Sequence, residues 1–161
     1  MKSNNELIEF FSIVKKFDND IDNEVIIPIV MNDFFEIMET KTIEEIFILL
    51  YCLDDDSKRL DITWFICDGI ISQYLKNANF FFFFFLENVK IIYPHATNVS
   101  IYILQPILKN NPEARKLLCE SLESADKESL SIFKEIYLLM IEEDNTYSDE
   151  CILSKLNMTS S

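Results

Sequence analysis

The chain has 161 residues and a formal net charge of −14, from 28 acidic and 14 basic side chains. Its hydrophobic fraction of 49% is too high for a disordered chain, and its single glycine and four prolines disfavour a turn-rich all-β fold and glycine-rich phosphate loops. The negative charge argues against direct binding to nucleic acid or anionic lipid and favours a basic protein partner.

Helical periodicity runs along most of the chain. Apolar residues such as Leu7, Phe10 and Val14 recur every three or four positions, as on one face of a helix. Residues suited to helix capping precede these stripes, and Thr42 with Glu45 matches a capping box. Counted from their proposed capping residues, the predicted helices cover residues 4–17, 23–38, 42–53, 61–75, 79–94, 97–108, 111–122, 126–144 and 148–156.

The first six predicted helix starts are regularly spaced. They lie 19, 19, 19, 18 and 18 residues apart, at Asn4, Asn23, Thr42, Asp61, Asn79 and Thr97. Two such helices make a unit of about 38 residues, which is close to the repeat length of helix-pair solenoids. We therefore predict a single all-α domain over residues 1–161, built as a compact array of about nine antiparallel helices in HEAT-like pairs.

Six consecutive phenylalanines, Phe80 to Phe85, mark the predicted centre of the core. On a helix they would point in all directions around the axis, so the segment would have no face suited to water. A strand buried on both faces would also fit this run. Further along, residues 91–93 and 99–104 could pair as a short hairpin within 89–104. Helix and strand alternatives therefore stay open in this part of the chain.

The cysteines are widely spaced and form no CxxC pair, so with a single histidine they make no zinc pattern. We interpret them as free, mostly buried thiols in a reducing cytosol. The sequence MKSNNELIEF has no apolar signal segment, and no apolar stretch reaches the length of a membrane span. We therefore predict a cytoplasmic protein. The residues concerned are Cys52, Cys67, Cys119, Cys151 and His95.

No segment predicts a metal, cofactor or catalytic site. Asp18, Asp20, Asp22 and Glu24 alternate as in a calcium loop, but the glycine and the final glutamate of an EF-hand are missing, so a solvated turn is the better interpretation. His95 follows Pro94 in a connection and has no accompanying serine or cysteine motif. The sequence thus predicts a protein that is not an enzyme.

Acidic side chains are concentrated in the two flanks of the chain. Residues 1–53 hold 11 acids and 4 bases, residues 111–161 hold 11 and 5, and the middle is nearly neutral. Two acidic clusters at predicted helix ends are the candidate partner-binding residues. They are Asp54, Asp55 and Asp56, and Glu142, Glu143 and Asp144. Exposed tyrosines would be further interface anchors, with Tyr102, Tyr137 and Tyr147 as candidates.

Segments such as TIEEIFILLYCLDDD and ESLSIFKEIYLLMIEED, in a small, acidic, helical chain, resemble the immunity proteins of bacterial polymorphic-toxin and contact-dependent growth inhibition systems. The resemblance implies a tight complex that blocks the active site of a toxin domain, often a basic nuclease. It carries no motif from which individual residues could be transferred. The alternative is a helical-repeat adaptor that binds some other basic protein, and a small helical enzyme would need a polar pocket that the sequence does not reveal.

Overall fold

The computed structural model describes residues 3–18 and 26–157, and every regular element in these ranges is helical. They contain eight α-helices and two 3-10 segments. The elements are α1 (Ser3–Phe17), α2 (Ile26–Thr40), α3 (Ile43–Phe47), η1 (Ile48–Cys52), α4 (Leu60–Ile92), α5 (Thr97–Leu108), α6 (Pro112–Leu122), α7 (Lys127–Glu143), η2 (Asn145–Tyr147) and α8 (Glu150–Asn157). The prediction of an all-α fold is confirmed.

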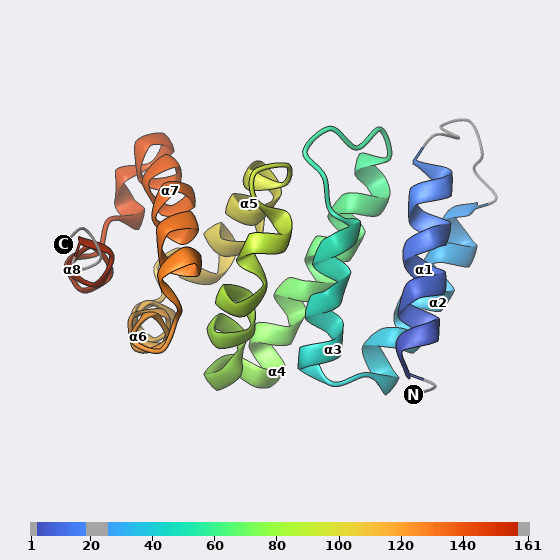
Figure 1. Ribbon diagram of the computed structural model, residues 1–161, viewed down its shortest axis with the longest axis horizontal. Coiled ribbons are helices and arrows are strands. Elements are labelled where there is room, and N and C mark those ends of the chain that lie inside the picture. Colours follow the sequence, from blue (N-terminus) through green and yellow to red (C-terminus); the bar gives the residue numbers. More distant parts are fainter. Residues whose placement is uncertain (1–2, 19–25, 158–161) are drawn as a thin grey trace.

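The helices stand side by side in an elongated array (Figure 1). The pair α1 and α2 forms one end of the array, and α8 lies at the other end. The long helix α4 lies in the middle, where it contacts α3, α5, α6 and α7. A continuous core of buried apolar side chains extends from Leu7 in α1 to Leu156 in α8.

The helix count differs from the predicted nine because α4 holds two of the predicted helices. Asn77 has non-helical backbone angles, with φ −140° and ψ 42°, and it separates a segment ending at Lys76 from one beginning at Ala78. The break is confined to one residue, so the two segments follow each other without a loop. The predicted helix start at Asn79 therefore lies two residues beyond the real break.

The predicted alternative of a hairpin within 89–104 is wrong. Residues 89–92 complete α4, and residues 97–104 belong to α5, with only a four-residue turn between the helices. Val89, Ile92, Val99 and Ile103 are all buried, and their spacing within each helix is three or four residues. This spacing points them to one side of a helix, where they pack into the core.

The phenylalanine run has an exposed side, contrary to the prediction that it is buried all round. Phe81, Phe82 and Phe85 have 0% exposure and contact one another. Phe80 is 60% exposed and Phe83 is 39% exposed. The second half of α4 therefore packs into the core but keeps a strip exposed to solvent at Phe80 and Phe83.

The single glycine of the chain allows α2 and α4 to approach closely. A Cβ atom at Gly69 would lie 2.2 Å from the ring atom Cζ of Phe34, which is itself buried. Phe34 also contacts Phe10 of α1 and Phe65 of α4 through its ring. Because Gly69 has no side chain, Phe34 can pack against α4 and connect the terminal pair α1 and α2 to the middle of the array.

Candidate protein-binding surface

The first predicted acidic cluster, Asp54 to Asp56, lies in the loop between η1 and α4. Two of its three carboxylates accept hydrogen bonds from backbone N–H groups of the same protein. The carboxylate of Asp55 accepts the backbone N–H groups of Asn98 at 2.9 Å and Val99 at 3.0 Å, in the first turn of α5. The carboxylate of Asp54 accepts the N–H of Asp56 at 2.9 Å. Asp56 is the exposed member. Of this cluster, Asp56 is therefore the residue best placed to meet a partner.

In the second predicted cluster, Glu142 to Asp144, two of the three carboxylates also accept hydrogen bonds within the protein. Asp144 accepts the N–H of Thr146 at 3.0 Å and so caps η2, and this hydrogen bond lowers the pKa of its carboxyl group. Glu143 accepts a hydrogen bond of 3.2 Å from the side chain of Gln105 in α5. Glu142 is exposed. Asp144 thus has a structural role at the start of η2, and Glu142 is the member of this cluster best placed to meet a partner.

A groove between α1 and α2 gathers acidic side chains that the sequence analysis did not single out. Glu6 and Glu9 of α1 and Asp33 and Glu36 of α2 line it, around a volume of about 250 Å³. We call this feature the acidic groove. The further lining residues are Phe10, Ile37 and Thr40.

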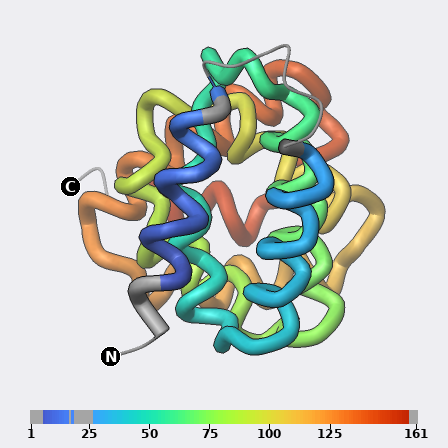
Figure 2. The backbone as a smooth tube through the Cα atoms, turned by 90° about the vertical axis from the view of Figure 1, so that its right-hand side faces the viewer, coloured from blue at the N-terminus to red at the C-terminus, as the bar shows by residue number. Residues whose placement is uncertain are grey.

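The acidic groove lies at the N-terminal end of the array, where Figure 2 shows α1 and α2 side by side, facing the viewer. Lys41 forms an ion pair with Glu6 at this groove. Each helix contributes two acids spaced three residues apart, so the sequence could have indicated two acidic stripes. It could not have indicated that these stripes face each other, because that depends on how the helices pack.

Two of the three candidate tyrosine anchors are buried. Tyr137 has 0% exposure, and its hydroxyl donates a hydrogen bond of 2.7 Å to the backbone carbonyl of Tyr147, which is also buried. Burial raises the pKa of Tyr137 to about 12. These two residues stabilise the C-terminal part of the core. Tyr102 is the candidate that remains at the surface, with 37% exposure.

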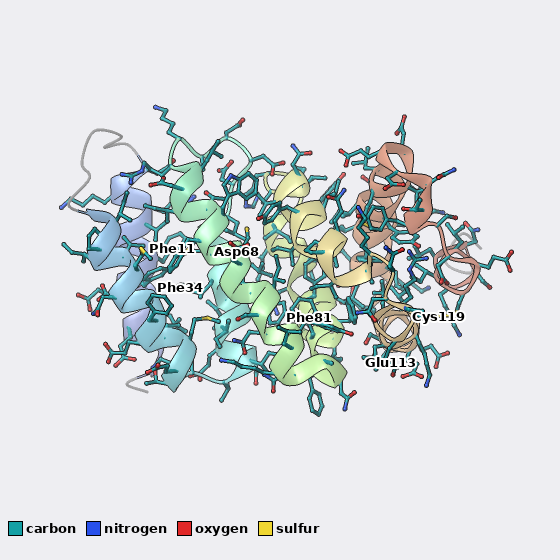
Figure 3. The ribbon with its side chains drawn as sticks, turned by 180° about the vertical axis from the view of Figure 1, so that it is seen from behind. Phe11, Phe34, Asp68, Phe81, Glu113 and Cys119 are labelled. Carbon is teal, nitrogen blue, oxygen red and sulfur yellow. A yellow bond between two sulfur atoms is a disulfide. The ribbon has the colours of Figure 1, made fainter. Side chains whose placement is uncertain are left out.

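Cys119 in α6 and Cys151 in α8 form a disulfide, with their Cα atoms 6.3 Å apart (Figure 3 labels Cys119). The prediction of four free thiols is therefore wrong for this pair. The sequence analysis missed it because the pairing depends on how α6 and α8 pack side by side. Cys52 and Cys67 are free and buried, as predicted. Burial raises the pKa of each of these thiols to about 12, which is unsuited to a nucleophile at neutral pH.

A second groove, of about 890 Å³, lies beside this disulfide. Two basic residues that line it, Arg115 and Lys155, already bind other groups of the protein. Arg115 donates hydrogen bonds to the backbone carbonyls of Leu108 and Thr146, and Lys155 forms an ion pair with Glu123. These contacts fasten α8 and η2 to α6, which is a structural role.

Of the alternating acids that we interpreted as a solvated turn, three lie outside the described residues, namely Asp20, Asp22 and Glu24. Asp18 is described, and its carboxylate accepts hydrogen bonds from the Ser57 hydroxyl at 2.6 Å and the Lys58 N–H at 3.1 Å. Among residues 3–18 and 26–157, no group of three or more potential ligand side chains is arranged to hold a metal ion. Asp18 thus connects the end of α1 to the loop before α4.

Within the same ranges, no helix combines the length and apolarity that crossing a membrane would require. Comparison with known proteins gives no relative for this chain, since no family model, curated protein or solved structure matches it.

Proposed function

We propose that this protein binds a basic protein domain and neutralises it, as an immunity protein that blocks a cognate toxin nuclease. The observation that carries the proposal is the acidic groove. Its four lining carboxylates come from two facing helices, and among the described residues Lys41 forms an ion pair with one of them, Glu6. An adjacent lysine or arginine side chain from a partner would relieve the repulsion between these acids.

The overall charge supports the same proposal. With 28 acidic and 14 basic residues, the protein would attract a basic surface over about 10 Å at 0.1 M salt and increase the rate of encounter. In a nuclease, the groups that hold substrate phosphates are commonly lysine and arginine. Carboxylates placed against these groups would occupy the positions of the phosphates and exclude the substrate.

We propose a binding protein rather than an enzyme. The two free thiols, Cys52 and Cys67, are buried and have a raised pKa. We also propose that the protein acts in the cytoplasm, where it would meet a toxin nuclease at its target. The Cys119–Cys151 disulfide is more typical of oxidising compartments, so the cytoplasmic location needs its own test by cell fractionation.

The proposal is tested by expressing the protein together with the product of the adjacent gene and measuring growth protection and copurification. We expect the pair to copurify and the cells to survive. The variant Glu9→Gln/Glu36→Gln removes two charges from the acidic groove and should weaken both readouts. The matched control, Glu87→Gln/Glu113→Gln, removes two exposed charges elsewhere and should retain them.

Equal loss in both double variants would show that total charge, and not the groove, determines binding. Copurification with a basic protein that is not a toxin, without protection, would favour the helical-repeat adaptor. Absence of any basic partner would overturn the proposal.

A further inference from the structure

The outer surface of α4 and α5 carries two aromatic rings and a carboxylate in contact. The ring centroids of Trp64 in α4 and Tyr102 in α5 are 4.4 Å apart, with an interplanar angle of 39°. The hydroxyl of Tyr102 donates a hydrogen bond of 3.2 Å to Oδ1 of Asp68, one turn along α4 from Trp64. We call these three residues the aromatic–acid cluster.

The cluster lies at the surface. Asp68 is exposed, Tyr102 is 37% exposed, and Trp64 is only partly buried against the core. Figure 3 views the array from this side and labels Asp68 near its middle. Tryptophan and tyrosine are enriched among the residues that contribute most to binding at protein surfaces.

Two polar neighbours of the cluster, one on each helix, already have partners within the fold. Asp61, one turn before Trp64 on α4, is bound to the guanidinium of Arg59 at 2.8 Å. On α5, Gln105 lies one turn beyond Tyr102 and donates to Glu143. The Asp68 carboxylate accepts a hydrogen bond from the Tyr102 hydroxyl, and a carboxylate can accept about four hydrogen bonds, so its oxygens can take further donors.

We propose that the aromatic–acid cluster is a recognition site for an arginine side chain of the basic partner. The guanidinium group is planar, so it can stack on an aromatic ring while its N–H groups donate to the Asp68 carboxylate. Lysine offers a compact ammonium group that cannot stack in this way, so the site should prefer arginine. This inference rests on the proposed function and names the side chain that the partner presents at this surface.

The protein contains a single tryptophan, so fluorescence from Trp64 reports directly on the site. The experiment titrates the full-length protein with an arginine nonapeptide and, separately, with a lysine nonapeptide of the same charge. We expect the arginine peptide to change the Trp64 emission and to bind about fivefold more tightly than the lysine peptide. Calorimetry on the same samples measures binding anywhere on the protein.

Two matched variants separate this site from general attraction between charges. Asp68→Asn removes the charge at the cluster and should weaken arginine-peptide binding about tenfold, as expected for a lost charge-assisted contact. Glu113→Gln removes one exposed charge on α6, well separated from Asp68 in Figure 3, and should weaken it less than twofold.

Two results would overturn the arginine site while leaving the proposed binding of a basic partner intact. One is calorimetric binding of the arginine peptide without a change in the Trp64 emission. The other is an equal loss of affinity in the two variants. Equal affinity for the arginine and lysine peptides would also overturn it. No calorimetric binding of either peptide would count against the arginine site and the proposed function together.

Discussion

Asp55 caps a helix that begins more than forty residues later, because its Oδ1 atom accepts the backbone N–H of Val99 at 3.0 Å. The first N–H groups of a helix have no partner within the helix, and an acidic side chain satisfies them while also favouring the positive end of the helix dipole. The backbone N–H of Asp55 in turn donates to the carbonyl of His95 at 2.8 Å. The loop before α4 thus holds the start of α5 in place.

Asp55→Ala should lower the free energy of unfolding by about 0.5 to 2 kcal/mol, the range for loss of a helix cap. Asp56→Ala, one position further along the same loop, should change it by less than about 0.5 kcal/mol because this side chain is exposed. Urea denaturation measures both values. Equal stability of the two variants would mean that the cap contributes nothing, and that Asp55 is available to a partner as the sequence suggested.

Phe82 and Phe83 are neighbours in sequence but should differ in their contribution to stability. Phe82 has 0% exposure, so Phe82→Ala should cost about 3 to 5 kcal/mol. Phe83 is 39% exposed, so Phe83→Ala should cost only about 1 kcal/mol. Urea melts of the two variants check this difference, and similar losses would place the whole run in the core.

Protonation of Asp126 in acid should lower the stability of the protein. Hydrogen bonds from the Ser129 backbone N–H, and then from Lys90, hold the pKa of Asp126 at about 2, below its ordinary value of 3.8. The ionised group therefore stabilises the fold fully above its ordinary pKa, and this stabilisation is lost as the pH falls toward 2.

The check compares the urea midpoints of the native protein and Asp126→Asn from neutral pH down to about pH 2. Asparagine keeps a neutral cap, so the difference reports the charge. The native protein should be the more stable of the two at neutral pH, and the two midpoints should converge near pH 2. A difference that does not vary with pH would contradict the assignment. Asp56→Asn serves as the control for a charge lost at an exposed position.

The disulfide between Cys119 and Cys151 should be detectable by counting reactive thiols. In denaturant without a reducing agent, alkylation should modify two cysteines, Cys52 and Cys67, and prior reduction should raise this number to four. Cys119→Ser/Cys151→Ser should lower the free energy of unfolding by about 2 to 4 kcal/mol, as expected when the link between residues 32 positions apart is removed. Four reactive cysteines in protein purified without reductant would contradict the pairing.

Short-range sequence signals predicted the helix starts well where the capping residue belongs to the helix itself. Thr42 and Glu45 form the predicted capping box, and Asn111 and Asp126 cap α6 and α7 as expected. The sequence placed the starts of α4 and α5 approximately, but it did not identify the side chains that stabilise these starts. Asp61, the expected cap of α4, instead binds Arg59.

The side chains that hold the loop before α4 and the start of α5 in place are distant in sequence and therefore had no local signal. Asp18, at the end of α1, accepts the N–H groups of Lys58 and Arg59 just before α4, and Asp55 caps α5. The same limit applies to the candidate binding surface. Trp64 and Tyr102 come from different helices, and so do the two sides of the acidic groove. Their contact depends on helix packing, which a single sequence does not encode as a local pattern.

The most direct test of the proposed function is the rate of association between this protein and the product of the adjacent gene, measured at low and high salt. Steering by the acidic surface predicts that the association rate constant falls at least tenfold between about 0.05 and 0.5 M salt, while dissociation changes less. Glu9→Gln/Glu36→Gln should slow association at low salt more than Glu87→Gln/Glu113→Gln does. An association rate that does not depend on salt, or no complex at either salt concentration, would contradict the account.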